Sequence, residues 1–268
     1  MKKRTAFIGA ILSLIPIGQP FLIKTGVVLS TTGLIFSITE KAQAASATFY
    51  FDSAYEKAER GDHYGAISDY TKAIEINPND DYAYYNRGIS KRKLKDDYGA
   101  ISDYTKAIEI NPSFEQAYYN RGNAKSDIED YYGAISDYNK SIEINPNYVS
   151  AYYNRGNAKS RIKDSYGAIS DYTKAIEINP QHFKAYNNRG YTKSKIKDYY
   201  GSISDFNKAI EIAPAYALAY TNRSQSKENI GDMKGACADA KKAFSLGDED
   251  ANKSWIMENC KFFKSYLK

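Results

Sequence analysis

The chain has 268 residues, 43% of them hydrophobic, which is enough for one or two ordinary domains. It contains 26 Tyr but only 2 His and 2 Cys, so a His/Cys metal centre or an iron–sulfur cluster is close to excluded. The net charge of +5 is concentrated at the N-terminus, where residues 1–44 hold five basic residues and one acid. The remaining 224 residues carry 32 basic and 31 acidic side chains. We therefore expect no metal, no cofactor and no nucleic-acid partner.

The N-terminal segment has the pattern of an export signal. A basic start is followed by apolar stretches at 6–23 and 26–38, the second too short to span about 30 Å of hydrocarbon as a helix. The sequence Ala42-Gln43-Ala44 fits the small-x-small rule, which predicts cleavage after Ala44 of a signal peptide at 1–44. Export across a bacterial-type inner membrane would place the rest in a periplasm or lumen. The alternative is an uncleaved anchor facing that compartment, and this would be the chain's only membrane contact.

From residue 47 onward the chain repeats every 34 residues, as its prolines show. Such a period is typical of stacked helix–turn–helix units. Each unit predicts a helix A at about positions 2–14 and a helix B that begins after an Asp at position 16. Helix B is expected to end at Asn-Pro, because proline cannot continue the helical hydrogen-bond ladder. We number the units as repeats one to six, at 47–80, 81–114, 115–148, 149–182, 183–216 and 217–250.

The residues inside each repeat resemble the tetratricopeptide repeat family. The shared marks are Tyr at position 4, Gly at 8, Ala at 20 and 27, Tyr or Phe at 24 and Pro at 32. The resemblance covers 204 residues and implies an all-α, right-handed superhelical solenoid of six repeats. Residues 251–268 place Ile256, Cys260, Phe263 and Leu267 on one helical face, which predicts a C-terminal capping helix.

One departure from the family pattern concerns charge. The family usually has Leu at position 7, whereas repeats two to six have Arg, and every repeat has Asp at position 23. Only repeat one lacks the arginine, and it has no preceding repeat, so we expect each Asp to pair with the Arg of the next repeat. The alternatives are pairing within a repeat or two solvated charges. The predicted pairs are Asp69–Arg87, Asp103–Arg121, Asp137–Arg155, Asp171–Arg189 and Asp205–Arg223.

The two cysteines are predicted to form a disulfide. Cys237 takes the position-21 place of an isoleucine, and Cys260 lies on the predicted capping helix. Export and the even cysteine count favour the disulfide. The alternative is two small buried hydrophobic residues.

The candidate binding surface is the stripe of helix A opposite helix B, which lines the inner groove in tetratricopeptide superhelices. A row of asparagines spaced by one repeat can hydrogen-bond an extended peptide, because each amide offers donors and an acceptor. The alternative is that these asparagines only pack, since they are common in the family consensus. The candidate residues are Asn86, Asn120, Asn154, Asn188 and Asn222 at position 6, Tyr85, Tyr119 and Tyr153 at position 5, Asn123 and Asn157 at position 9, and Lys93, Arg161 and Lys195 at position 13.

A carboxylate clamp of the kind that holds chaperone tails is disfavoured, because it needs Lys at position 5. Catalysis is also disfavoured. His63 and His182 are isolated and predicted to be exposed in turns, and no phosphate loop or nucleophile motif occurs. We expect a non-enzymatic scaffold or assembly factor that binds a protein or peptide in its groove. The alternative is a membrane-tethered organiser that self-associates through a Tyr-rich surface.

Overall fold

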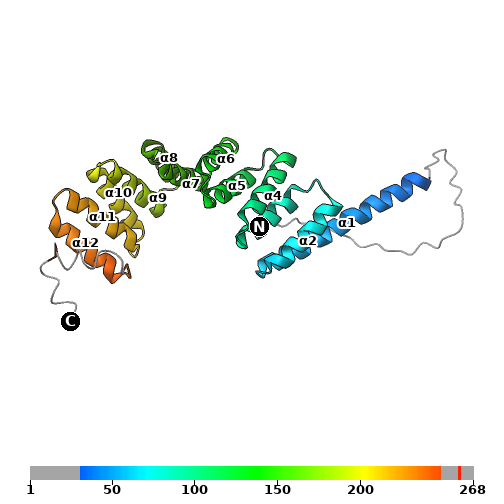
Figure 1. The fold of residues 1–268 in the computed structure, drawn as a ribbon, viewed down its shortest axis with the longest axis horizontal. Helices are drawn as coiled ribbons and strands as arrows, with labels where there is room; N and C mark the ends of the chain where they lie inside the picture. Colours follow the sequence, from blue (N-terminus) through cyan, green and yellow to red (C-terminus); the bar gives the residue numbers. More distant parts are fainter. Residues whose placement is uncertain (1–30, 249–258, 261–268) are drawn as a thin grey trace. The chain divides into compact units, whose positions relative to one another are not determined.

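The computed structural model describes residues 31–248 and 259–260. The described residues form α-helices joined by short turns, and they divide into two compact parts. We call them the N-terminal unit, which ends at Pro112, and the C-terminal unit, which begins at Ser113. Figure 1 shows the helices in chain order. Among the described residues, none of the helices combines the length and apolarity needed to cross a bilayer.

The N-terminal unit contains four helices, in which α2 packs against both α1 and α3, and α3 packs against α4. Helix α1 begins well before the predicted helix A of repeat one, and the predicted cleavage point after Ala44 lies inside it. The first 30 residues of the predicted signal peptide lie outside the described residues. The helices are α1 (Thr31–Glu59), α2 (His63–Ile76), α3 (Asp81–Lys93) and α4 (Asp97–Ile110).

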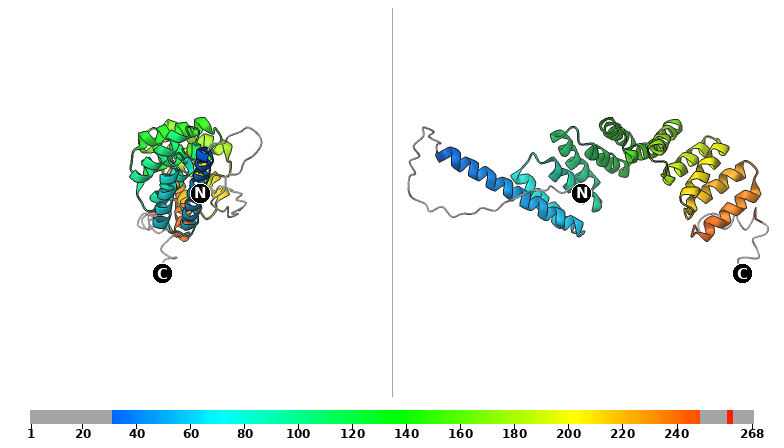
Figure 2. Two further views of the ribbon diagram at one scale, coloured as in Figure 1. Left: turned by 90° about the vertical axis from the view of Figure 1, so that its right-hand side faces the viewer. Right: turned by 180° about the vertical axis from the view of Figure 1, so that it is seen from behind.

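The C-terminal unit stacks four helix pairs, and each helix packs against the helices before and after it in this unit. Successive A helices also touch, as α5 does with α7 and α7 with α9. The right-hand view of Figure 2 shows these pairs following one another along the chain. The helices are α5 (Glu115–Asp127), α6 (Tyr131–Ile144), α7 (Val149–Arg161), α8 (Ser165–Ile178), α9 (Phe183–Lys195), α10 (Tyr199–Ile212), α11 (Ala217–Asn229) and α12 (Met233–Ser245).

The start of every B helix follows the predicted capping rule. In repeat four the Asp164 carboxylate accepts a hydrogen bond from the backbone N–H of Gly167 at 2.9 Å, which satisfies one free donor of the first turn. The same contact recurs in the other five repeats. Helix B ends at an asparagine in repeats one to four, directly before the proline. Local sequence therefore sets the boundaries of these helices.

The core of repeats two to five depends on a glycine facing an aromatic ring. In repeat four a Cβ on Gly156 would come within 2.7 Å of the Tyr172 ring, so any larger residue would displace that ring. Ala168 and Ala175 are fully buried on the facing helix. The all-α stack of tetratricopeptide-like repeats predicted from the sequence is thus confirmed. The predicted capping helix at 251–268 lies outside the described residues except for positions 259 and 260.

Candidate functional site

A groove of the C-terminal unit lies along the A helices. It encloses about 1110 Å³ and extends from the end of α5 across α7 and α9 to α11. Predicted groove residues that line it are Asn157, Asn188, Asn222, Arg161 and Lys195. Tyr191 and Leu218 add exposed apolar surface, and Asp127, Glu129 and Lys163 add charge. In this unit, part of the inner stripe predicted from the sequence therefore lines a groove.

The asparagines of the predicted inner stripe hold successive repeats of the C-terminal unit together. Both N–H groups of the Asn154 amide are used, one by the Tyr119 hydroxyl at 3.0 Å and one by Asn123 Oδ1 at 2.8 Å. The Tyr138 hydroxyl donates to the same Asn123 oxygen at 2.8 Å. This network links position 6 of one repeat to positions 5, 9 and 24 of the repeat before it.

The same network recurs one repeat further along. Asn188 donates to the Tyr153 hydroxyl at 3.0 Å and to Asn157 Oδ1 at 2.9 Å, and Tyr172 donates to Asn157 at 2.9 Å. Burial raises the pKa of Tyr153, which keeps its hydroxyl protonated. Between repeats five and six, Asn222 instead donates to Asn187 Oδ1 at 3.0 Å. The amide donors expected to hold a peptide are thus already engaged between repeats.

The tyrosines at position 5 are also engaged. The Tyr119 ring lies 4.8 Å from the Tyr148 ring, and the Tyr153 ring lies 4.8 Å from the imidazole of His182. Tyr119, Tyr153 and Asn120 are all half-buried. The hydrogen bonds to their hydroxyls and the contacts of their rings give Tyr119 and Tyr153 a structural role that the sequence analysis did not predict.

In the N-terminal unit the predicted groove residues Tyr85 and Asn86 are not on a free surface. Tyr85 is 7% exposed and Asn86 is fully buried, so neither can contact a peptide in this structure. Repeat one places Phe51 at position 5, and a phenyl ring has no atom to accept the Asn86 amide. The third predicted residue of this unit, Lys93, is exposed. The prediction is therefore wrong for Tyr85 and Asn86.

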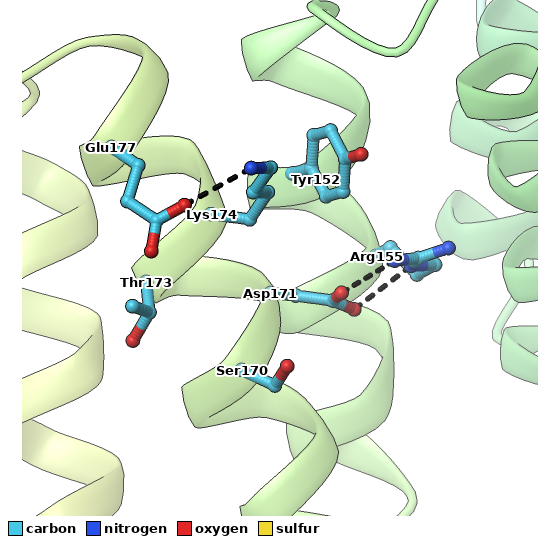
Figure 3. Close-up of a pocket in the computed structure, with 7 residues that line it drawn as sticks. All are labelled: Tyr152, Arg155, Ser170, Asp171, Thr173, Lys174 and Glu177. Carbon is cyan, nitrogen blue, oxygen red and sulfur yellow. Dashed lines mark hydrogen bonds and ion pairs between the residues drawn. The ribbon is translucent and has the colours of Figure 1, made fainter.

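The structure also corrects the pairing of the charged rows. Arg155 donates to both carboxylate oxygens of Asp171 in its own repeat, Nε to Oδ2 at 2.9 Å and Nη2 to Oδ1 at 2.6 Å. Figure 3 shows this fork, with Lys174 facing Glu177 nearby. The predicted pairing with the next repeat is wrong, because the arginine lies directly opposite the aspartate of its own hairpin. The observed pairs are Arg87–Asp103, Arg121–Asp137, Arg155–Asp171, Arg189–Asp205 and Arg223–Asp239.

The arginines nevertheless contact the preceding repeat, through position 25 rather than position 23. Nη1 of Arg155 donates to Asn139 at 2.6 Å, and Nη1 of Arg189 donates to Thr173 at 3.0 Å. Arg87 and Arg223 make the same contact with Thr71 and Asn207. This explains why repeat one, with no preceding neighbour, has Ser53 in place of arginine. There Ser53 donates to Asp69 within its own repeat at 2.7 Å.

A lysine at position 11 completes each charged cluster, and the sequence analysis missed it. Lys159 lies 2.9 Å from Asp171 Oδ2, so the buried carboxylate pairs with two cations. All six repeats carry this lysine, and its recurrence beside the Arg and Asp rows was the available signal. The lysines are Lys57, Lys91, Lys125, Lys159, Lys193 and Lys227.

The two cysteines are joined, as the sequence predicted. The structure places a disulfide between Cys237 of α12 and Cys260, and Cys260 is buried against Ala240. The covalent bond ties the last described helix to the C-terminal segment.

The two histidines lie at the starts of helices, His63 as the first residue of α2 and His182 directly before α9. Among the residues that the structure describes, no group of three His, Cys, Asp or Glu side chains is placed to hold a metal. His182 is not an exposed turn residue as predicted, because it caps α9 by accepting a hydrogen bond from the Ala185 N–H at 3.2 Å. Burial lowers the pKa of His182, which favours the neutral ring that this cap requires.

The fold and the repeated packing contacts define an α-helical repeat protein with an inner groove. Tetratricopeptide repeat models match residues 82–114, 115–148 and 149–182, and related models match 54–95 and 171–203. The chain belongs to the tetratricopeptide repeat family.

Solved structures of several repeat proteins are similar to this chain. The MamA protein is 27% identical, with a TM-score of 0.61 over 64% of this chain and 94% of its own. YrrB, described as a TPR protein with an unusual peptide-binding site, is 22% identical, with a TM-score of 0.61 over 72% of this chain and 97% of its own. A tetratricopeptide repeat protein from Parabacteroides merdae is 22% identical, with a TM-score of 0.60 over 81% of this chain and 98% of its own. No curated protein sequence matches this chain significantly.

Proposed function

We propose that this protein is a non-enzymatic interaction scaffold that binds an extended segment of a partner protein in the groove of its C-terminal unit. The observation that carries the proposal is the groove itself, which has room for a chain segment and presents charge beside exposed apolar surface. The described peptide-binding site of YrrB supports this kind of function. The asparagines contribute by fixing the distance between repeats, and the side chains on the groove surface make the contacts.

The test is a pull-down with the full chain, read by mass spectrometry. The groove variant combines Tyr191→Ala with Leu218→Ala, two side chains exposed in the groove. The matched control combines Tyr166→Ala with Tyr200→Ala, which are exposed at the start of α8 and α10. Partners lost only from the groove variant would support the proposal. Partners that remain with the groove variant would contradict it.

A second candidate function is self-association, because one exposed row of tyrosines has no described role in the fold. Position 18 places a tyrosine on the surface of each B helix in repeats one to five, with exposures of 74–77%. Sedimentation at several concentrations tests this function. A monomer at all concentrations, with and without the control substitutions, would reject it. The tyrosines are Tyr64, Tyr98, Tyr132, Tyr166 and Tyr200.

We also propose that the chain is exported and cleaved after Ala44, with retention as a membrane anchor as the alternative. The basic start and the Ala42-Gln43-Ala44 sequence support the proposal. N-terminal sequencing of the exported protein should begin at Ala45, and an earlier start would reject cleavage at this bond.

A further inference from the structure

The charges around the groove are sorted by repeat. At the end of α5, repeat three contributes two carboxylates, Asp127 and Glu129. The corresponding positions 13 and 15 of repeat four hold Arg161 and Lys163, and repeat five adds Lys195. One end of the groove is therefore acidic, and the rest of its rim is basic.

The basic side chains of this rim differ from the cations elsewhere in the same helices. Arg155, Lys159 and Lys174 each have a carboxylate within 3.0 Å. Among the residues that the structure describes, neither Arg161, Lys163 nor Lys195 forms an ion pair. The Lys195 ammonium lies 4.9 Å from the centre of the Tyr191 ring, on the groove surface. These three cations are available to a ligand.

The backbone at position 15 is left-handed in every repeat, and repeats two to five carry a side chain there. Glu129 and Lys163 have φ angles of 63° and 64°, in the left-handed region that disfavours residues with a side chain. Repeats one and six have glycine at this position, Gly61 and Gly231, with φ angles of 82° and 81°. Glycine adopts this conformation at little cost, so a charged residue there lowers stability.

Helix stability accounts for Arg161 and Lys195, which end α7 and α9, but not for the acidic residue at the corresponding position of repeat three. A cation near the C-terminus of a helix is favourable, because it faces the negative end of the helix dipole. Asp127, the last residue of α5, has the opposite charge at that end. The pattern of one acidic repeat followed by two basic repeats therefore calls for a different explanation.

We propose that the groove binds an acidic, extended protein segment. Its carboxylates lie against Arg161, Lys163 and Lys195, and a basic residue of the segment faces Glu129. This inference rests on the proposed function and adds the chemistry of the partner. The exposed surfaces of Tyr191 and Leu218 receive an apolar side chain of the same segment. The cations lie at positions 13 and 15, at the end of helix A. A carboxylate clamp instead needs a lysine at position 5.

The experiment selects random 12-residue peptides displayed on phage against the immobilised full chain. A parallel selection uses the combined variant Arg161→Glu, Lys163→Glu and Lys195→Glu. The matched control has three charge reversals on exposed B-helix lysines, Lys140→Glu, Lys174→Glu and Lys208→Glu, which lie outside the groove lining. Circular dichroism checks that all three proteins keep the same helix content.

The wild-type and control proteins should enrich Asp and Glu at least twofold over the unselected library, and the groove variant should enrich Lys and Arg instead. The best acidic peptide, measured by fluorescence anisotropy, should bind the groove variant at least tenfold more weakly, and salt should weaken its binding to the wild type. Peptides that compete for the groove without acidic enrichment would overturn this inference but keep the proposed function. Recovery of no groove-binding peptide would overturn both.

Discussion

Two charged regions of the C-terminal unit have similar residues but opposite arrangements. Between the helices of each hairpin, one buried aspartate is held by an arginine and a lysine, as Asp171 is by Arg155 and Lys159. Along the groove rim, Arg161, Lys163 and Lys195 form no ion pair with the described residues. The difference indicates that charges paired inside a hairpin stabilise the stack, whereas charges on the rim are left for a partner.

The largest effect is expected from breaking the paired region. Asp171→Ala leaves Arg155 and Lys159 without their carboxylate, both more than three-quarters buried, and should lower the free energy of unfolding by about 3 kcal/mol. Urea denaturation measures this loss. Glu177→Ala, which removes the exposed partner of Lys174, serves as the control and should cost less than about 0.5 kcal/mol.

The pairing within a repeat can be tested against pairing between repeats by double-mutant cycles. Asp171 and Arg155 should show a coupling of about 2 kcal/mol, whereas Asp137 and Arg155 should show almost none. Equal couplings in the two cycles would contradict the pairing seen in the structure.

The hydrogen-bonded region of the groove gives a second, smaller contrast. Tyr172→Phe removes the hydroxyl that donates to Asn157 and should cost about 1 kcal/mol. Tyr104→Phe should be neutral or slightly stabilising, because the buried Tyr104 hydroxyl has no partner among the described residues. Repeat two has Ile89 where repeats three and four have Asn123 and Asn157, which explains this difference. An equal loss in both variants, measured by urea denaturation, would reject the structural role of the network.

Substituting Lys163, the groove residue with a left-handed backbone, should change stability and partner binding in opposite directions. Lys163→Gly removes the side chain from a left-handed backbone position and should stabilise the protein by about 0.5–1 kcal/mol. The same variant should weaken partner binding, because it removes a rim charge. Lys163→Ala is the control, since it removes the charge but keeps the strain. Thermal unfolding that gives Lys163→Gly no advantage over Lys163→Ala would contradict the account of this position.

The smallest expected effect concerns His182. Its pKa is lowered by burial, so the folded state favours the neutral ring, and stability is lost as pH falls below the ordinary value of 6.5. Protonation also removes the acceptor that caps α9, which is worth about 1 kcal/mol. His182→Asn supplies a cap that does not titrate, so its urea midpoint should fall less than that of the wild type between pH 7.5 and pH 5.5. Equal falls would show that His182 is not responsible.

The sequence predicted the repeats well because their signals are local. Asp164 before Gly167, and Asn179 before Pro180, define the two ends of α8 without any long-range contact. The pairing of Asp171 was harder to predict, because the 34-residue period places one arginine before it and another after it, Arg155 and Arg189. Only the packing of the helices decides which of the two is the partner.

The groove was predicted only in part, because contacts between repeats are not visible in the sequence. Of the position-6 asparagines, Asn188 and Asn222 line the groove, whereas Asn86 is buried. The sequence could not show that the Asn188 amide donates hydrogen bonds to both Tyr153 and Asn157, because these contacts join different repeats. The charged residues at position 15 were overlooked, although the glycines in repeats one and six marked that position as a tight turn.

The most direct test of the groove as the binding surface is hydroxyl-radical footprinting of the full chain with and without its bound partner or selected peptide. Tyr191 lies in the groove and is 41% exposed, and Tyr166 lies on the row of surface tyrosines and is 76% exposed. The account predicts that the partner protects Tyr191 from modification and leaves Tyr166 unchanged. Protection of Tyr166 with no change at Tyr191 would contradict it.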